Sequence, residues 1–245
     1  MTGLVARDAR AAVDAGDHVA LTGHGSHQAG RAPFPASLRL IHEDEDLLVI
    51  DKPPGLLTVA TDRERERTAY RFLWDYLASR RPPGRPFIVH RLDRDTSGLI
   101  AFAKSPAAKR QLQAQFEART AEREYVAVVE GRVLAEAGTL ESRLTEDRAL
   151  RVRAAPAGKA AITHYQVLAG RRETTVLALT LGTGRRHQIR VQLADLGHPI
   201  AGDREHGSRH NPFGRLALHA CRLGLVHPAT GRRVSFESAP PDGWV

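Results

Sequence analysis

A run of nine residues rich in polar side chains stands between two short apolar segments in the first half of the chain. Residues 90–98 read HRLDRDTSG, preceded by FIV at 87–89 and followed by LIAFA at 99–103. Short apolar segments of this kind are typical of buried β-strands. Two such strands would hold the polar run at a strand end, where a rigid scaffold commonly carries binding and catalytic side chains. The run therefore predicts a functional loop on a sheet.

Apolar and alternating segments elsewhere predict an α+β fold with a largely antiparallel sheet. A first hairpin is expected from strands at residues 38–42 and 47–50, joined by an acidic turn. Later strands are expected at residues 125–129, 160–168 and 174–181, and in a final pair around residues 228–231.

Three helices are expected between these strands. The first covers residues 68–80, with Thr68 as its N-cap and the breaker PPG soon after it. The second begins after Ser105, which precedes a proline in the first helical position. The third covers residues 187–196 and ends at Gly197.

The composition is that of a globular protein in a reducing compartment. The chain has 245 residues, 42% of them hydrophobic, and no apolar run near the ~20 residues that cross a bilayer. Its start lacks the pattern of a signal peptide. The one cysteine, Cys221, excludes an internal disulfide. We expect a cytoplasmic protein with no membrane partner, and a monomer, because no exposed apolar stripe requires a dimer.

The charge is strongly basic and comes from arginine. The net charge is +8, and only four of the 36 basic side chains are lysines. Guanidinium groups match the geometry of phosphate, so a nucleic acid is one interpretation. A sequence rich in arginine and alanine also follows from coding DNA rich in G and C. Charge alone therefore favours nucleic acid only slightly.

Residues within the polar run have ordinary structural interpretations when each is taken alone. An aspartate in such a loop, as at Asp93, is more often a turn or cap residue than a catalyst. Asp95 is expected to bond the amides or hydroxyls of Thr96 and Ser97. His90 closes an apolar strand and is expected to be structural.

A second cluster, GTGRRHQIR at residues 182–190, places three arginines and a histidine after a glycine turn. Such an arrangement favours the binding of anions.

Five segments, in order, resemble the RluA-type pseudouridine synthases. They are HRLDRDTSG at 90–98, REYVA at 123–127, GRRHQIR at 184–190, GHPIAGD at 197–203 and LALHA at 216–220. The likeness spans residues 38–241, which makes residues 38–245 a catalytic domain and residues 1–37 an N-terminal extension. Within the extension, residues 13–21 resemble the closing strand of a small RNA-binding module often fused to these synthases. An ordinary extension with a turn at Gly16 is the alternative.

The resemblance implies a pseudouridine synthase fold, with a mixed, mostly antiparallel central sheet, flanking helices and an RNA-binding cleft. It implies conversion of uridine in structured RNA to pseudouridine by base flipping, followed by aspartate-dependent cleavage and re-formation of the glycosidic bond. No metal and no cofactor are expected. The favoured substrate is 23S ribosomal RNA, and transfer RNA is the alternative.

The resemblance also implies a catalytic set of Asp93, Tyr125 and Arg190. Asp93 would act either as a nucleophile or in removing a proton from the ribose, and the sequence does not choose between these routes. Arg190 would pair with Asp93 and keep it ionised. Tyr125 would stack on the target base and accept its carbon-5 proton late in the reaction.

RNA contacts are expected from a further group of residues. Arg91 would fill the space that a flipped base leaves, with a phosphate contact as the alternative. Leu218 would line the uracil pocket. The other expected RNA-binding residues are Lys52, Arg185, Arg186 and His187.

Three rival functions fit the sequence less well. A non-catalytic RNA-binding protein would not need Asp93, Tyr125 and Arg190 together. A metalloenzyme is indicated only by the 12 histidines, because neither HExxH nor CxxC spacing occurs. A glycoside hydrolase could use Asp93 with Asp95, but a basic cleft does not suit a neutral sugar polymer.

Overall fold

The computed structural model describes residues 33–147 and 149–244. The predicted N-terminal extension over residues 1–37, with its possible remnant of an RNA-binding module, lies almost wholly outside them. Within the described ranges, no helix is long and apolar enough to cross a membrane.

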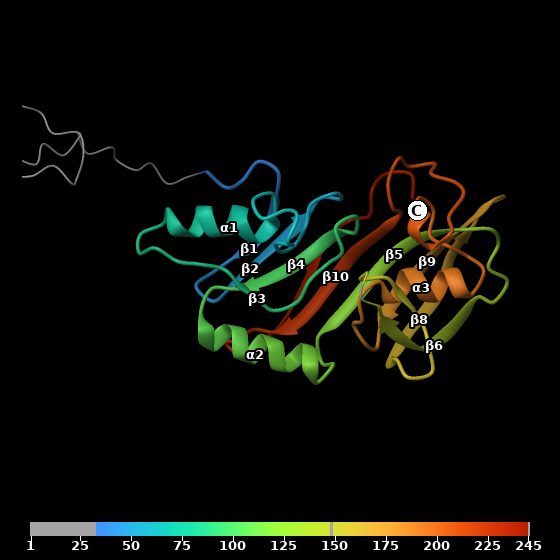
Figure 1. Ribbon diagram of the computed structural model, residues 1–245. Helices are drawn as coiled ribbons and strands as arrows, with labels where there is room; N and C mark the ends of the chain where they lie inside the picture. Colours follow the sequence, from blue (N-terminus) through green and yellow to red (C-terminus); the bar gives the residue numbers. More distant parts are fainter. Residues whose placement is uncertain (1–32, 148, 245) are drawn as a thin grey trace, which may run out of the picture. The chain divides into compact units, whose positions relative to one another are not determined.

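Eleven strands form one mixed sheet (Figure 1). The strands are β1 (Arg39–Glu43), β2 (Leu47–Lys52), β3 (Phe87–Ile88), β4 (Ser97–Ala103), β5 (Glu122–Glu130), β6 (Ala137–Glu146), β7 (Val152–Ala154), β8 (Lys159–Gly170), β9 (Thr174–Leu181), β10 (Leu218–Val226) and β11 (Arg233–Glu237). Their order is β1-β2-β4-β10-β5-β9-β8-β6-β7, with β3 beside β4 and β11 beside β10. Only β4 and β10 pair in parallel among the described strands. The predicted α+β fold with a mostly antiparallel sheet is confirmed.

Two helices cover opposite faces of the sheet around β2 and β4. Helix α1 (Ala69–Ala78) packs with one alternate set of strand residues, which includes Leu48 and Phe102. Helix α2 (Pro106–Glu117) packs with the other set, which includes Leu47 and Ala101. Every residue of β4 is buried, because both faces of the strand are covered. The apolar segment after the polar run is thus a central strand.

Both helices begin where the sequence predicts. The Thr68 hydroxyl accepts a hydrogen bond from the backbone N–H of Arg71 at 3.0 Å. The Ser105 hydroxyl accepts one from the backbone N–H of Ala108, also at 3.0 Å. Each cap satisfies a donor that the first helical turn leaves free, which is worth about 1 kcal/mol.

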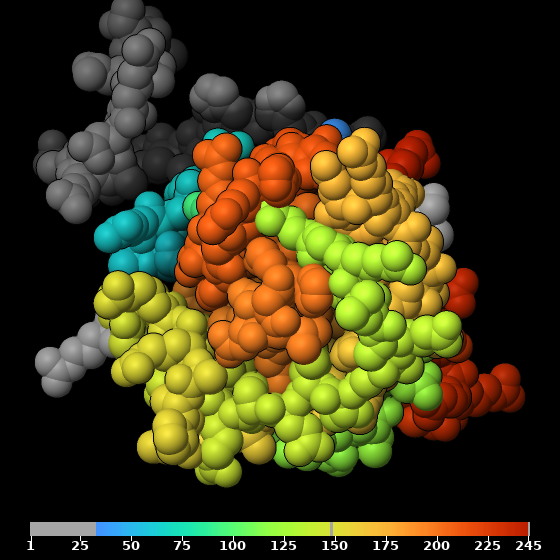
Figure 2. Space-filling model, turned by 90° about the vertical axis from the view of Figure 1, so that its right-hand side faces the viewer, coloured from blue at the N-terminus to red at the C-terminus, as the bar shows by residue number. Residues whose placement is uncertain are grey.

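Helix α3 (Gln188–Asp195) lies over β6 and β8 (Figure 1). Its residues from Gln188 to Leu193 are all buried, some against the main core and Val191 against Leu144, Val152 and Ala161. Figure 2 shows the orange segment that contains this helix, flanked by yellow-green and yellow segments of β6 and β7. Residues 188–193 of the helix are therefore enclosed, and their polar side chains must find partners inside the protein.

Glycine at position 98 allows the parallel contact between β4 and β10. In this contact Gly98 lies opposite Ala220, and its φ of +110° lies in a region that side chains with a Cβ avoid. A Cβ built on Gly98 would lie 2.2 Å from the carbonyl oxygen of Ala220. The last residue of the HRLDRDTSG run therefore fixes how closely the two central strands approach behind the loop.

We expect Gly98→Ala to lower the free energy of unfolding by about 3 kcal/mol, because it adds both backbone strain and an overlap with Ala220. Urea denaturation followed by circular dichroism measures this change.

The matched control is Gly170→Ala, at the end of β8. A Cβ added to Gly170 would have no atom within 4 Å, and this glycine has no positive φ. This variant should stay within about 1 kcal/mol of the parent protein. Equal losses in the two variants would contradict the role assigned to Gly98.

Candidate active site

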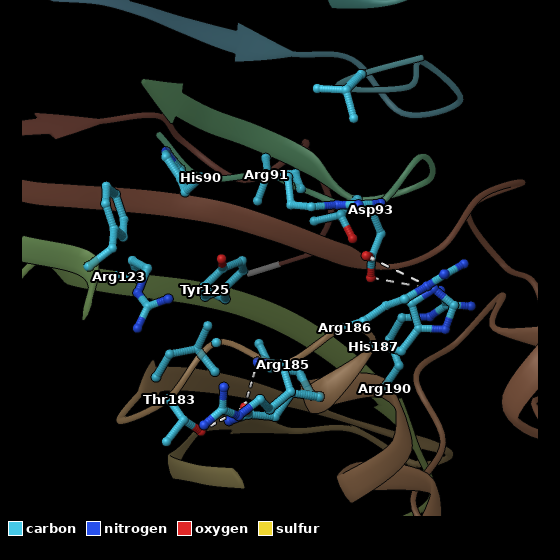
Figure 3. A pocket seen from close by; sticks show the side chains of 18 of the residues that line it. His90, Arg91, Asp93, Arg123, Tyr125, Thr183, Arg185, Arg186, His187 and Arg190 are labelled. Carbon is cyan, nitrogen blue, oxygen red and sulfur yellow. Dashed lines mark hydrogen bonds and ion pairs between the residues drawn. The ribbon is translucent and has the colours of Figure 1, made fainter. Parts of the chain in front are cut away.

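A cavity of about 900 Å³ opens beside the polar run. That volume is in the range of small-molecule and base-binding pockets. Figure 3 shows side chains from separate parts of the sequence converging on it. Eight of the nine residues expected at the site line this cavity: Arg91, Asp93, Tyr125, Arg185, Arg186, His187, Arg190 and Leu218.

The end of β2 and the segment after it hold the backbone of the Asp93 loop on both sides of the aspartate. The Thr58 hydroxyl donates to the Leu92 carbonyl at 2.8 Å and accepts from the Leu92 N–H at 3.2 Å. The Lys52 ammonium donates to the Arg94 carbonyl at 2.9 Å. Because both neighbours of Asp93 are held, the position of its carboxylate is determined by backbone bonds as well as by side-chain pairs.

Lys52 is the expected RNA-binding residue that the structure places elsewhere. Its side chain is fully buried, and besides the bond to Arg94 it donates to the carbonyls of Pro53 and Leu56 at 2.9 and 2.8 Å. Burial lowers the pKa of its ammonium to about 7, although Asp95 and Asp93 oppose the shift. The expectation of direct RNA contact is corrected here: Lys52 is buried and supports the Asp93 loop from inside.

Arg190 faces three carboxylates. Its Nε and Nη2 each bond an oxygen of Asp203 at 2.7 Å, and Nη2 also bonds Glu205 at 2.9 Å. Its Nη1 lies 3.8 Å from Asp93 Oδ2, so the expected pair with Asp93 is present as the longest of the three. Burial would lower the pKa of Arg190, but the bonds to Asp203 and the nearby carboxylates raise it well above its usual range.

Asp203 is a site residue that the sequence did not identify. It belongs to the GHPIAGD segment, where an aspartate before a short helix is easily interpreted as a turn residue. Its side chain is only 1% exposed and forms the two-bond pair that orients the Arg190 guanidinium. The signal available in the sequence was its place in a segment resembling the family, not its immediate neighbours.

His187 belongs to the surroundings of Asp93. Its backbone adopts a left-handed conformation, with φ +50°, directly before α3. Figure 3 shows its ring beside Arg190, with both facing Asp93. The ring Nε2 lies 3.9 Å from Asp93 Oδ1, and the side chain is 8% exposed. Burial is the main cause that lowers its pKa, against the opposing charge of Asp93.

Tyr125 and Leu218 line the cavity from two central strands, β5 and β10, that pair with each other. Both side chains are buried, with Tyr125 7% exposed. Burial raises the pKa of the Tyr125 phenol to about 12. The phenol is therefore neutral near pH 7, and its ring presents a flat apolar face to the cavity.

His90 is structural, as its position at a strand end predicted. Its Nε2 accepts a hydrogen bond from the backbone N–H of Ala101 at 3.0 Å, and its ring stacks on Phe116 at 4.4 Å. Burial lowers the pKa of this imidazole to about 3, so it stays neutral.

Asp95 differs from expectation, because it pairs with Arg94 at 3.2 Å and Thr96 Oγ1 has no partner among the described residues.

Arginines border the cavity at different depths. Arg91 and Arg185 are exposed, and Arg185 also donates to the Ala160 carbonyl at 3.1 Å. Arg186 pairs with Glu146 at 2.6 Å.

Within the described ranges, the buried Nε atoms of Arg186 and Arg123 have no hydrogen-bond partner, and both residues line the cavity. Arg123, two positions before Tyr125, was not predicted as a site residue, and its buried Nε remains without a partner in the described part of the chain.

Comparison with known proteins agrees with this geometry. Residues 46–195 match the family model described as RNA pseudouridylate synthase. An uncharacterized RNA pseudouridine synthase, YhcT of Bacillus subtilis, is 36% identical over 233 residues, which are 94% of this chain and 77% of that protein. A ribosomal large subunit pseudouridine synthase D of Pseudomonas aeruginosa is 38% identical over 85% of this chain and 70% of its own length.

A solved structure gives the same result for the fold. The human RNA pseudouridylate synthase domain containing 1 superposes with a TM-score of 0.65 at 27% identity, over 85% of this chain and 84% of its own. Its match extends beyond the segment covered by the family model, as the matches to the two bacterial relatives do. The chain therefore belongs to the RNA pseudouridylate synthases, and within them to the RluA type.

Proposed function

We propose that this synthase isomerises uridine in the RNA of the large ribosomal subunit, the 23S RNA, with Asp93 as its catalytic carboxylate. The observation that carries the proposal is that Asp93, Tyr125 and Arg190, from three distant parts of the sequence, line one cavity. The substrate is supported by relatives named ribosomal large subunit pseudouridine synthase D. Transfer RNA is the alternative substrate.

The reaction needs no net oxidation or reduction. The bond between ribose C1′ and uracil N1 breaks, the base turns, and a bond forms between C1′ and C5. The proton on C5 leaves, and N1 gains one. An ionised carboxylate at the sugar can start this sequence, either by attacking carbon or by helping to remove a ribose proton. Asp93 fits either route because its side chain is 20% exposed and can reach a substrate in the cavity.

Arg190 supports this role through charge and orientation. It contributes a positive charge 3.8 Å from Asp93, while its other donors are bound to Asp203 and Glu205. A guanidinium held in this way cannot swing toward an RNA phosphate without leaving a buried carboxylate unpaired, which is costly. Arg190 is therefore a fixed part of the site that presents a positive charge to Asp93.

Tyr125 and Leu218 are suited to holding an uncharged base. A base stacked on an aromatic ring gains about 1–3 kcal/mol, and Leu218 adds an apolar wall. Because the phenol is neutral, it can donate a hydrogen bond to the base. To accept the C5 proton it would have to pass its own proton on in the same step. Arg91, which is exposed and belongs to the same loop as Asp93, would stack where the flipped base left the RNA helix.

We expect Asp93→Asn to reduce turnover by about 10³-fold or more, because the neutral amide can neither attack carbon nor take a proton. Release of tritium from RNA labelled at C5 of uridine measures the reaction. RNA affinity, followed by fluorescence anisotropy, should stay within a few-fold of the parent.

The matched control is Asp95→Asn, two residues away in the same loop, where the carboxylate pairs with the exposed Arg94. It should retain most of the activity. Full turnover by Asp93→Asn would overturn the proposed mechanism.

Asp203→Asn should lower kcat by about 10- to 100-fold, the usual cost of removing a partner that orients a catalytic group. RNA affinity should change little, because Asp203 is buried behind Arg190. The control is Asp195→Asn, an exposed aspartate at the end of α3. Wild-type kcat in a folded Asp203→Asn variant would show that the guanidinium needs no such support.

Tyr125→Ala should weaken RNA binding by about 10-fold, whereas Tyr125→Phe should bind within about 2-fold of the parent, since the phenyl ring keeps the stacking face. Fluorescence anisotropy measures the affinity, and both substitutions are made in the Asp93→Asn background so that the RNA is not turned over during the titration. Equal weakening by Phe and Ala would show that the hydroxyl, and not the ring, holds the base.

A further inference from the structure

Two histidines and a glutamate lie together beside Asp93 and Arg190. The proposed reaction does not use this cluster. His187 precedes α3, while Glu205 and His206 belong to the short 3-10 helix η1 (Arg204–His206). The ring atoms His187 Nδ1 and His206 Nε2 lie 3.2 Å apart, and Glu205 Oε1 lies 3.7 Å from the same His187 nitrogen. The three potential ligand atoms all lie within 4.8 Å of one another.

The charges around this cluster favour a cation. Arg190 contacts the three carboxylates of Asp93, Asp203 and Glu205, so this network of four side chains carries an excess of negative charge. An excess of negative charge beside two imidazole nitrogens is a suitable environment for a divalent cation.

We propose that His187 Nδ1, His206 Nε2 and Glu205 Oε1 form a binding site for one divalent transition-metal ion, with Zn²⁺ as the preferred occupant. Two nitrogen and one oxygen ligands match the chemistry that Zn²⁺ selects. Ligands about 2.0–2.1 Å from a tetrahedral ion lie roughly 3.3 Å from each other, close to the 3.2 Å between the two ring nitrogens.

Glu205 can complete this set with a small movement. Its side chain is 48% exposed, and its two oxygens already divide their contacts, with Oε2 on Arg190 and Oε1 toward His187. A half-exposed side chain can close the remaining gap to the imidazoles by rotation about its χ angles. Three protein ligands leave a fourth position for solvent, as in open zinc sites.

The ion would act on the catalytic aspartate through the imidazole of His187. A metal on Nδ1 leaves the ring proton on Nε2, the atom that lies 3.9 Å from Asp93 Oδ1. At 3.9 Å the two atoms form no hydrogen bond, and shortening of this contact would give the metal–histidine–carboxylate arrangement in which each partner orients the next. The site thus links cation binding to the orientation of Asp93 without making the ion a reactant, and its existence does not depend on the RNA substrate.

The direct test is Zn²⁺ binding to the full chain, prepared without a histidine tag, by competition with a chromophoric chelator. We expect one ion per chain, and at least 10-fold weaker binding in both His206→Ala and Glu205→Gln. Glu205→Gln is isosteric and half-exposed, so it keeps the test valid if the histidine variant does not fold. The control His164→Ala removes an exposed histidine on β8 and should bind Zn²⁺ as the parent does.

Unchanged affinity in Glu205→Gln and in a folded His206→Ala, or equal weakening in the control, would overturn the proposal. The ligand atom is tested separately by ¹⁵N NMR of histidine-labelled protein. With Zn²⁺ bound, the His187 resonances should show the proton on Nε2. A proton on Nδ1 in the zinc-bound protein would contradict the assigned geometry.

Discussion

The buried pair between Arg190 and Asp203 is the interaction on which the site depends. Both side chains are almost fully enclosed, and two bonds of 2.7 Å fix the plane of the guanidinium. A charge buried this deeply is tolerated only when its partner is in place. The pair joins α3 to the loop before η1 and leaves Nη1 as the nitrogen nearest Asp93. Without Asp203, the guanidinium would lose the constraint that directs it toward the Asp93 loop.

The position of Asp93 results from a second set of constraints at the other side of the cavity. Thr58 and Lys52 bond the backbone of its two neighbours, and Gly98 allows β10 to approach directly behind the loop. These contacts involve backbone atoms, so they place the aspartate without consuming its carboxylate oxygens. One side of the cavity therefore positions Asp93, and the other side supplies its charged partner.

The sequence predicted the elements with a strong local signal and missed those that depend on tertiary contacts. Thr68 and Ser105 were identifiable as caps because their chemistry acts on the next three residues. Lys52 was expected to bind RNA, yet its ammonium is bonded to three backbone carbonyls inside the protein. Asp203 and Arg123 could not be assigned from their neighbours, since their partners and cavity are formed by distant segments.

The charged side chains of the site differ between the border of the cavity and its interior. Under the proposed function, the arginines at the border bind RNA, and the groups inside take part in the reaction. Arg91 and Arg185 are exposed at the border of the cavity, where a phosphate can reach them without desolvating a buried group. Arg190, at its base, is already bound to carboxylates. An RNA backbone is therefore attracted to the outer arginines, while the negative cluster below repels phosphate. Only an uncharged group such as a flipped uracil can enter between Tyr125 and Leu218 at little electrostatic cost.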